Sequence, residues 1–431
     1  MRLMVLAPIA PPGHRYGTEI VACDIAAGWA EAGHEVTLAG PGTTDGAAGL
    51  DGVRVRPFPP GPPPDRLRHV SRRSDLPPAL IEAVREARPE KAVVVGFGPG
   101  GITLTHMEHL RDMGVEIGLW HHVPGITCQQ HGLRLKNRTV CDGEVRIGRC
   151  AACRLTAAGL PEPLAEAASR LPGPVSAARL PGPAGHVLGG RALSAVFARS
   201  VADLVGLVSC VFVGADWVRP VLMRNGVGAD RISLVRPGLR RDFTGTGQPT
   251  DRAPGPLRLI YWGRIDDTKG IDVAIRAVRL SPADVRFEIV GRVDQGVPFH
   301  RHLTTLADGD PRIVFAGRLE AGPLAARLAA ADVAVIPSVW PETGPLTAFE
   351  AHAAGLPILG SDIGGIGEIA GADPSARTFP RGDAAALARL IEELATDPAE
   401  LARRCALVPR ARTMTQVAAE MAEAMGFGCG K

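Results

Sequence analysis

Short apolar runs alternate with longer segments of helical periodicity along most of the chain. In the first half, the predicted strands are RLMVLAPI, GHEVTLAG, KAVVVGF, VEIGLWHH and GLVSCVFVG. The helices predicted between them are TEIVACDIAAGWAEAG, ALIEAVREA and GITLTHMEHLRDMG. The second half continues the pattern with LRLIYWG, VRFEIVG, RIVFAG, ADVAVIP and LPILGS. Strands that alternate with helices in this way are typical of α/β folds with parallel sheets.

The chain is expected to divide into two domains. Its 431 residues are too many for one ordinary hydrophobic core and enough for two. The segment GTGQPTDRAPGPL is rich in Gly, Pro and polar residues, as a linker is, so we place the boundary near Leu239–Pro256. We expect a first domain over residues 1–240 and a second over 241–410. Residues 411–431 are predicted to form a C-terminal helix that can pack back on the first domain.

Two stretches of the first half are predicted to be irregular. They are PFPPGPPPDRLRHVSRR and a Cys-bearing, Pro- and Gly-rich insert near residues 128–190. Insertions of this length in a compact α/β domain are typical of binding loops or lids. The basic run Asp65–Arg73 suits an anionic membrane surface or an acidic acceptor, but a solvated loop is the preferred interpretation.

Composition and charge exclude several classes of partner. The formal net charge is +3 and 22% of the residues are charged, so no strong overall field favours nucleic acid. Aromatic residues make up 4%, which also argues against base-stacking platforms. The longest uncharged apolar run, Leu204–Ala215, is shorter than the roughly 18 residues that a membrane span needs. We expect a cytoplasmic protein and leave peripheral membrane association open.

The segment YWGRIDDTKGIDVAIRA joins a predicted strand to a predicted helix. It places Gly263 and Arg264 at the strand end and Lys269 at the helix start. Lys is rare in this Arg-rich chain, so Lys269 in a Gly-flanked motif stands out. Ligands of open parallel sheets bind beyond the carboxyl ends of the strands, near helix N-termini, and two cations there suit a diphosphate. The alternative is an exposed ion-pair cluster with Asp266 and Asp267.

A second motif, PETGPLTAFEAHAAGLP, places two glutamates around a helix start. Pro345 suits the first helical position, which makes Gly344 the expected cap and leaves nearby N–H groups open to an anion. Glu342 precedes the helix, and Glu350 lies in its second turn. One carboxylate can accept hydrogen bonds from a sugar and the other from a ribose. Because the helix around Glu350 is apolar on nearly all sides, a buried Glu350 needs a partner.

These motifs resemble those of a known family. GRIDDTKG followed by PSVWPETGPLTAFEAHAAGLPILGSDIGGIGE is similar to the donor-binding signature of the retaining glycosyltransferases of family 4, within glycosyl transferases group 1. The resemblance is strong from Arg258 to about Ile369 and weaker through the first half. It implies an α/β GT-B fold, in which two Rossmann-like doubly wound parallel-sheet domains face a cleft. The first domain would bind the acceptor and the second the nucleotide-sugar donor.

The resemblance also implies roles for individual residues. Arg264 and Lys269 would bind the leaving diphosphate. Glu342 would contact the transferred sugar, and Glu350 would bind the ribose. RYGTEIVACDIAAGWAEAGHEVTLAG resembles the family's Gly-rich first loop, with Gly17 where the backbone approaches the donor, although the usual double Gly is reduced here. The further donor contacts that the resemblance implies are Arg318, Leu319, Gly344, Pro345 and Leu346.

Two adjacent histidines are candidates for the sugar side of the site. EIGLWHHVPGITC resembles the family segment that carries a His near the transferred sugar, and the sequence does not choose between His121 and His122. Adjacent histidines at a strand end are otherwise a hydrogen-bonded structural feature. The expected catalytic set is completed by Glu342, Arg264 and Lys269.

The implied reaction moves a sugar from a nucleotide-diphosphate sugar to a hydroxyl or amine of a small-molecule, lipid or glycan acceptor. Its leaving diphosphate gains negative charge, which positioned cations stabilise. No D-x-D signature for a phosphate-bridging metal stands out, so we expect donor activation without a catalytic metal. Retention of the anomeric configuration is implied by the resemblance only.

Four cysteines of the insert form a candidate zinc site. Cys128, Cys141, Cys150 and Cys153 end in a C-x2-C pair, and four thiolates can hold a structural Zn²⁺. The spacing between them matches no standard zinc finger, so free thiols or a redox pair are the alternative.

Three other functions remain alternatives. Gly96, Gly98 and Gly101 follow a strand in G-x-G-x-x-G order, which is typical of NAD-dependent oxidoreductases. This motif lies on the fourth predicted strand rather than the first, and Pro99 lacks an N–H that the motif needs. A sugar-nucleotide epimerase on the same fold would turn over donor without acceptor. A catalytically idle scaffold that binds a partner would not activate the donor.

Overall fold

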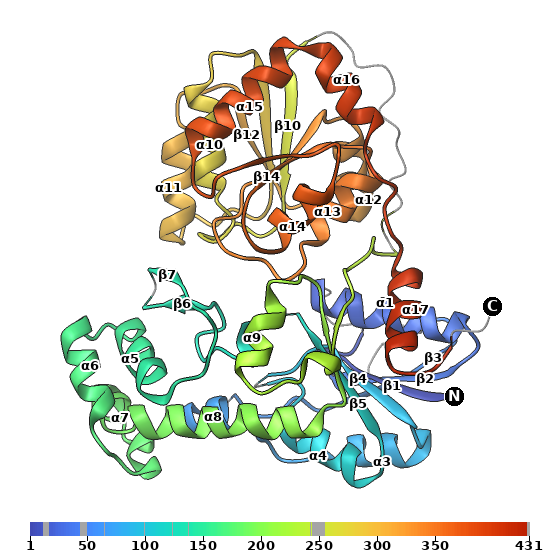
Figure 1. Cartoon of the computed structure of the whole chain (residues 1–431), viewed down its shortest axis with the longest axis vertical. Helices are drawn as coiled ribbons and strands as arrows, with labels where there is room; N and C mark the ends of the chain where they lie inside the picture. The colour runs from blue at the N-terminus through green and yellow to red at the C-terminus, as the bar shows by residue number, and fades with distance from the viewer. Residues whose placement is uncertain are drawn as a thin grey trace. The chain divides into compact units, whose positions relative to one another are not determined.

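The computed structural model describes residues 1–11, 17–43, 50–63, 65–98, 100–122, 124–136, 138–241, 243 and 255–428. The chain divides into two compact units. Unit 1 comprises Met1–Arg236 and Thr415–Lys431, and unit 2 comprises Pro237–Met414 (Figure 1). Most of the predicted linker GTGQPTDRAPGPL lies outside the described residues.

Unit 1 is built on a seven-stranded sheet in the order β3-β2-β1-β4-β5-β8-β9. The strands are β1 (Arg2–Leu6), β2 (Glu35–Pro41), β3 (Val53–Phe58), β4 (Lys91–Val94), β5 (Glu116–His121), β8 (Cys210–Val213) and β9 (Ile232–Leu234). Neighbouring strands pair in parallel. The chain runs outward from β1 to β3 and then crosses back to β4, so the direction of winding reverses between β1 and β4.

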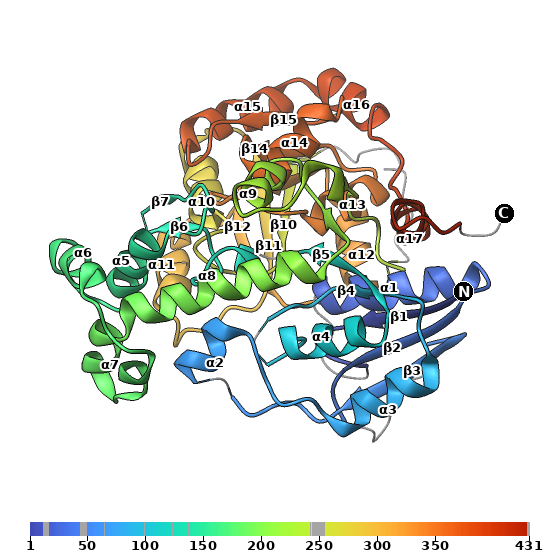
Figure 2. The same cartoon turned by 60° about the horizontal axis from the view of Figure 1, so that its bottom comes forward.

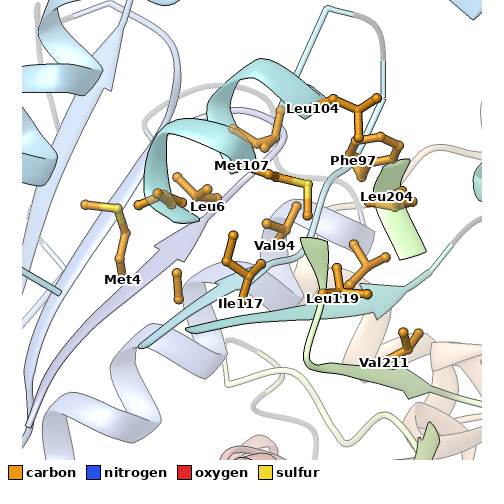
Figure 3. Packing of buried hydrophobic residues seen from close by; sticks show 14 of the residues in the cluster. Met4, Leu6, Val94, Phe97, Leu104, Met107, Ile117, Leu119, Leu204 and Val211 are labelled. Atoms are coloured by element: carbon orange, nitrogen blue, oxygen red, sulfur yellow. The ribbon is translucent and has the colours of Figure 1, made fainter. Parts of the chain in front are cut away.

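The helices of unit 1 either pack on this sheet or belong to the insert. They are α1 (Gly17–Glu31), α2 (Arg66–Ser71), α3 (Pro78–Ala87), α4 (Leu104–Asp112), α5 (Ile147–Ala157), α6 (Glu162–Arg170), α7 (Gly182–Leu188), α8 (Gly190–Leu207) and α9 (Val218–Arg224). Short 3-10 helices occur at η1 (Pro124–Ile126), η2 (Val175–Arg179) and η3 (Ala229–Arg231). On one face, Leu104 and Met107 of α4 pack on Val94 and Ile117 of the strands (Figure 3). This apolar contact anchors the helix layer.

The last helix, α17 (Met414–Ala424), lies beside α1 in unit 1 (Figures 1 and 2). The indole Nε1 of Trp29 donates a hydrogen bond to the Ala418 carbonyl at 2.8 Å. Lys91 Nζ donates to the Met425 carbonyl at 2.7 Å. The chain thus crosses to unit 2 and returns, and its final helix completes the helix layer over unit 1.

The insert near residues 128–190 is helical rather than irregular, which corrects the prediction from composition. After a short antiparallel pair, β6 (Arg134–Leu135) and β7 (Thr139–Val140), the chain forms α5, α6, η2 and α7. Pro161 caps α6 and Pro163 lies in its first turn, where a missing N–H costs no intrahelical bond. Pro and Gly therefore mark the helix ends here and not one long loop.

The basic run Asp65–Arg73 is also not a solvated loop. Asp65 caps α2 by accepting from the Arg68 N–H at 2.7 Å. Arg72 is buried between the rings of Phe97 and Phe197 and donates to the carbonyl of Ile126 at 2.9 Å. The neighbouring guanidinium of Arg73 pairs with two carboxylates on α4 and α8. Much of this charge is therefore used inside unit 1.

Unit 2 repeats the architecture with a six-stranded parallel sheet in the order β12-β11-β10-β13-β14-β15. The strands are β10 (Leu257–Trp262), β11 (Val285–Val290), β12 (Ile313–Gly317), β13 (Val333–Ile336), β14 (Ile358–Ser361) and β15 (Arg377–Phe379). The helices are α10 (Ile271–Leu280), α11 (Pro298–Ala307), α12 (Ala321–Ala329), α13 (Leu346–Ala353), α14 (Gly364–Ala372), α15 (Ala384–Thr396) and α16 (Pro398–Ala406). No helix within the described ranges is long and apolar enough to cross a membrane.

Alternation along β10 sends its side chains into two separate cores. Leu259 and Tyr261 pack in the cluster that contains α10, α11 and α15. Ile260 and Trp262 pack in the cluster that contains α12, α13 and α14. This period of two is expected for a strand that is buried on both faces. It places Trp262, the last residue of β10, against the helix that carries Glu350.

Candidate functional site

The two predicted motifs meet at the carboxyl ends of adjacent strands. β10 pairs with β11 on one side and with β13 on the other, so the winding of unit 2 reverses between β10 and β13. Residues 263–270 follow β10, and residues 337–345 follow β13. Open α/β sheets bind ligands at this position because loops and helix N-termini converge there.

A partly buried ion pair joins the two loops. Lys269 Nζ lies 2.8 Å from Glu342 Oε2, and both side chains are 19% exposed. The Ser338 hydroxyl donates to the other carboxylate oxygen of Glu342. Burial by itself raises the pKa of Glu342, but the charge and hydrogen bond of Lys269, with the Ser338 hydroxyl, outweigh it and lower the pKa overall. Glu342 is thus held as a carboxylate.

Glycine allows the two loops to approach closely. Gly270 adopts φ +65°, and a Cβ at this position would lie 2.0 Å from the Pro337 carbonyl oxygen. The Val339 N–H donates to the Thr268 carbonyl at 2.9 Å, which ties the loops together beside Lys269. A side chain at residue 270 would therefore separate the strand ends that carry the ion pair.

Arg264 differs from Lys269 in its surroundings. Its guanidinium lies 3.4 Å from Asp266, and its side chain is 75% exposed. The Tyr261 hydroxyl donates to the Arg264 carbonyl at 2.5 Å and fixes the backbone of the loop. The alternative of an exposed ion-pair cluster therefore describes Arg264 and Asp266. It does not describe Lys269, which pairs with Glu342.

The start of α13 corrects one local prediction. The helix begins at Leu346, and Pro345 is its N-cap with ψ 111°, so Pro345 is not the first helical residue and Gly344 is not the cap. The φ of Pro, fixed near −65°, suits both positions, and only ψ distinguishes them. The first N–H groups of α13 still lack intrahelical acceptors, so this helix end remains suited to an anion.

Glu350 is buried inside α13, and the predicted need for a partner is confirmed. The indole Nε1 of Trp262 donates to Glu350 Oε2 at 2.6 Å. Arg240 Nη1 lies 3.9 Å from Glu350 Oε1. Both carboxylate oxygens are therefore oriented by groups of unit 2. An acceptor held in this way is ready to receive a ligand hydroxyl without reorganising.

Arg318 and Leu319 follow β12, the edge strand, which β11 separates from β10. Arg318 is exposed and lies 3.8 Å from Glu320. Leu319 packs on the cluster of α12, α13 and α14. The described contacts do not join these two residues to the Lys269–Glu342 pair, although they lie at the same edge of the sheet.

Three predicted residues belong to unit 1. Gly17 is the first residue of α1, and residues 12–16 before it lie outside the described residues. His121 is the last residue of β5 and is buried, whereas His122 is partly exposed. Desolvation by burial lowers the pKa of each histidine to about 4, so both rings are neutral near pH 7. A neutral imidazole can both donate and accept a hydrogen bond.

The described structure gives no support to the predicted zinc site at the four cysteines of the insert. Among the described residues, no group of three or more His, Cys, Asp or Glu side chains is arranged to hold a metal. Cys153 accepts from the Lys136 N–H at 3.2 Å and donates to the Arg134 carbonyl at 3.4 Å. Burial raises the pKa of Cys150 to about 11.

The G-x-G-x-x-G motif follows β4 and not β1. Pro99 lies outside the described residues. The Thr103 N–H, at the start of α4, donates to His106 Nδ1 at 3.2 Å. A dinucleotide pyrophosphate would need free N–H groups at this helix start, and a side chain of unit 1 already accepts one of them. The arrangement gives the oxidoreductase alternative no support.

Several residues of the site were not predicted from the sequence. Ser338 bonds Glu342, Trp262 and Arg240 orient Glu350, and the Gly365 N–H donates to the Glu342 carbonyl at 2.7 Å. The sequence did contain a signal for Trp262, because the N–H of a buried indole requires a hydrogen-bond acceptor. Arg240 has no comparable local signal, since it lies far from Glu350 in the sequence.

Comparison with known proteins places the family match in the part of the chain that carries these motifs. Residues 248–411 match the family model of Glycosyl transferases group 1. Glycogen synthase of Mycobacterium tuberculosis is 32% identical over 228 residues, which cover 50% of this chain and 51% of that protein. The chain spans about half the length of the curated relatives that it matches first.

Solved structures resemble the whole chain. Anabaena Alr3699/HepE in complex with UDP has a TM-score of 0.63 and 15% identity, with 99% of each chain covered. A glycosyltransferase from Rickettsia africae has a TM-score of 0.64 and 13% identity, with 98% of each chain covered. At these identities the likeness shows the fold alone. The chain therefore has the expected GT-B fold of two parallel-sheet α/β domains, and its residues 248–411 match the group 1 glycosyltransferases.

Proposed function

We propose that this protein is a retaining glycosyltransferase of family 4 that uses a nucleotide-diphosphate sugar. The observation that carries the proposal is the partly buried Lys269–Glu342 pair at the point where the winding of unit 2 reverses. The pair lies between the loops that follow β10 and β13, and α13 begins just beyond it. Cation, carboxylate and helix N-terminus together match the phosphates and hydroxyls of a sugar nucleotide.

The chemical step would depend mainly on charge at the leaving group. When the bond between the sugar and the diphosphate breaks, negative charge grows on the diphosphate. Lys269, Arg264 and the N–H groups of Gly344 and Leu346 would stabilise it. Their positive charge is the reason to propose donor activation without a catalytic metal. Glu342, ionised and aligned by Lys269, would accept hydrogen bonds from the transferred sugar.

The same placement of the donor on unit 2 implies its other contacts. Glu350, oriented by Trp262 and Arg240, would accept hydrogen bonds from the ribose. Arg318 and Leu319 would lie near the base. In unit 1, Gly17 and either His121 or His122 would face the donor and the transferred sugar. The acceptor, a small molecule, lipid or glycan, would bind to unit 1 of a cytoplasmic or membrane-peripheral enzyme.

A ligand panel tests the proposal. Nucleoside diphosphates, their sugars and NAD would each be added while the thermal midpoint is measured, since a ligand of the folded state raises that midpoint. UDP is the first choice because the Anabaena protein was solved with it. We expect a nucleoside diphosphate to raise the midpoint for the wild type, and Lys269→Ala to lose most of the shift. A shift with NAD alone would overturn the assignment.

Turnover then separates the remaining alternatives. A glycosyltransferase hydrolyses its donor slowly without acceptor and faster when an acceptor is supplied. A sugar-nucleotide epimerase would instead convert the donor to an isomeric sugar nucleotide. Binding without any turnover across the panel of donors and acceptors would indicate an idle scaffold.

A further inference from the structure

The helical insert of unit 1 exposes an unusual concentration of aliphatic side chains. α5, α6 and α7 gather at one end of α8, away from the sheet, in both views (Figures 1 and 2). Five large side chains between residues 164 and 188 are 39–58% exposed. They are Leu164, Leu171, Val175, Leu180 and Leu188. We call these five residues, with Arg170 and Arg179, the insert patch.

Backbone contacts bring the parts of the insert patch together. Leu164 and Leu171 are seven residues apart along α6 and its C-cap, which places them on the same side of the helix. A Cβ at Gly173 would lie 1.9 Å from the Leu188 carbonyl oxygen, so the segment between Leu171 and Val175 lies directly on the end of α7. A Cβ at Gly185 would lie 2.1 Å from the Leu180 carbonyl oxygen, which joins α7 to η2 in the same way.

The charge around the insert patch has one sign. From Ala167 to Ala202 the chain contains no Asp or Glu. Arg170 and Arg179 lie in this stretch, and both are exposed. The nearest carboxylates on α6, Glu162 and Glu166, are paired with Lys136 at 2.5 and 2.6 Å. Arg138 also lies 3.2 Å from Glu162, so these two carboxylates face two cations. The surface therefore presents aliphatic side chains and guanidinium groups together.

A fixed backbone supports the insert patch. The Arg66 guanidinium donates to the Leu180 carbonyl at 2.9 Å and to the Gly182 carbonyl at 3.1 Å, between η2 and α7. Arg66, which belongs to the basic run Asp65–Arg73, therefore stabilises the backbone of the insert. In contrast to Arg72 and Arg73 of that run, Arg170 and Arg179 are placed to meet a partner outside the chain.

We propose that the insert patch docks unit 1 on an anionic phospholipid surface. Leu and Val side chains can enter the boundary between headgroups and acyl chains, while arginines contact lipid phosphates. Charge complementarity selects this occupant, because exposed arginines in a stretch without Asp or Glu fit a negatively charged plane. This binding is independent of the donor chemistry of unit 2.

Vesicle sedimentation of the full chain tests the proposal. We expect the protein to pellet with phosphatidylcholine vesicles that contain phosphatidylglycerol, and to remain in the supernatant with phosphatidylcholine alone. The double variant Leu171→Glu/Leu180→Glu should bind the anionic vesicles at least about tenfold more weakly, because it adds two charges of the wrong sign. Its matched control is Leu280→Glu on α10, where a leucine is 61% exposed outside the patch and binding should be unchanged.

A charge-reversal pair keeps the test decisive if the leucine variant folds poorly. Arg170→Glu/Arg179→Glu should lose binding by a similar factor, whereas Arg389→Glu, at an exposed arginine on α15, should not. Wild-type protein that stays in the supernatant with anionic vesicles would overturn the proposal, as would binding at the wild-type level by both double variants. So would sedimentation velocity that shows self-association through the patch in a protein that binds no lipid. Nucleotide binding by every variant is measured separately and reports on unit 2.

Discussion

Glu342 is partly buried and Glu350 is buried, and the structure satisfies their carboxylates in different ways. Glu342 has a full ion pair with Lys269 and a hydroxyl from Ser338. Glu350 has an indole N–H from Trp262 and a more distant guanidinium from Arg240. Each acceptor is therefore oriented before any ligand arrives, which limits the reorganisation that binding requires.

Replacing Lys269 by Ala should affect both chemistry and folding. We expect turnover of the donor to fall roughly 10²–10³-fold, because one preorganised charge at the leaving group is lost. The free energy of unfolding should fall by about 3–5 kcal/mol, since Glu342 stays partly buried without its cation. Steady-state kinetics and urea unfolding measure the two effects.

The double variant Lys269→Met/Glu342→Gln separates the effect on turnover from the effect on stability. With both charges removed, most of the lost stability should return while turnover stays low. Near-normal turnover in Lys269→Ala, or in Glu342→Ala, would remove these residues from the proposed reaction.

Trp262→Phe tests how Glu350 is oriented. The variant keeps an aromatic ring in the core but removes the N–H that donates to Glu350. We expect the affinity for the nucleoside diphosphate to fall by about tenfold and the free energy of unfolding by about 1–3 kcal/mol, because a buried acceptor loses its donor. Isothermal titration and urea unfolding are the measurements. Unchanged affinity would show that Trp262 serves packing only.

At the scale of elements, the site depends on two loops that touch. The β10–α10 loop and the segment after β13 meet where Gly270 faces the Pro337 carbonyl. Parallel strands place their carboxyl ends side by side, so any change in the spacing of these loops moves Lys269 relative to Glu342.

Gly270→Ala should therefore cost more than an ordinary loop substitution. Its matched control is Gly309→Ala, which has a similar φ of +75° but open space within 4 Å of the added Cβ. Both variants should lose about 1 kcal/mol of stability from backbone strain. Only Gly270→Ala should also lower the thermal midpoint further and weaken nucleotide binding. Equal losses in the two variants would show that the loop contact is unimportant.

At the scale of the whole molecule, the two units have separate cores, and the last helix is placed in the first of them. Trp29 and Lys91 hold α17 through its backbone carbonyls. The chain thus enters and leaves unit 2 at neighbouring points of its fold, as the bridge between Leu239 and Thr413 shows. The folding of unit 1 consequently needs both ends of the sequence.

Buried histidines should make unit 1 sensitive to acid. Burial lowers the pKa of His106 and of His121 to about 4, against 6.5 for an unburied ring. Between these values the unfolded chain binds protons that the folded unit excludes, so stability is complete above pH 6.5 and is lost as the pH falls toward 4. The loss is on the order of 3 kcal/mol for each histidine.

Urea unfolding at pH 7.5 and pH 5.0 measures about 2 kcal/mol of this loss for each histidine, because pH 5.0 is still above the folded-state pKa. His106→Gln should reduce it, because Gln preserves the capping position of His106 at the start of α4 but does not titrate. A free energy of unfolding that is the same at both pH values would contradict the prediction.

Local pattern was enough to determine much of the fold. Apolar runs predicted β10 to β14 and the strands β1, β2, β4, β5 and β8, because burial on both faces leaves a direct mark on the sequence. The same pattern placed Lys269 and Glu342 at strand ends and indicated that Glu350 would be buried. The helices of the insert were missed because Pro and Gly at their ends have the composition of loops.

The partners of these residues were decided by tertiary structure alone. Lys269 and Glu342 are 73 residues apart, and Trp262 and Glu350 are 88 apart, so no window of sequence contains either pair. The spacing of the four cysteines suggested a metal site, and the described residues give that site no support. Periodicity reports how each segment is buried, whereas the order of strands, and so the meeting of distant side chains, is fixed only when the whole sheet assembles.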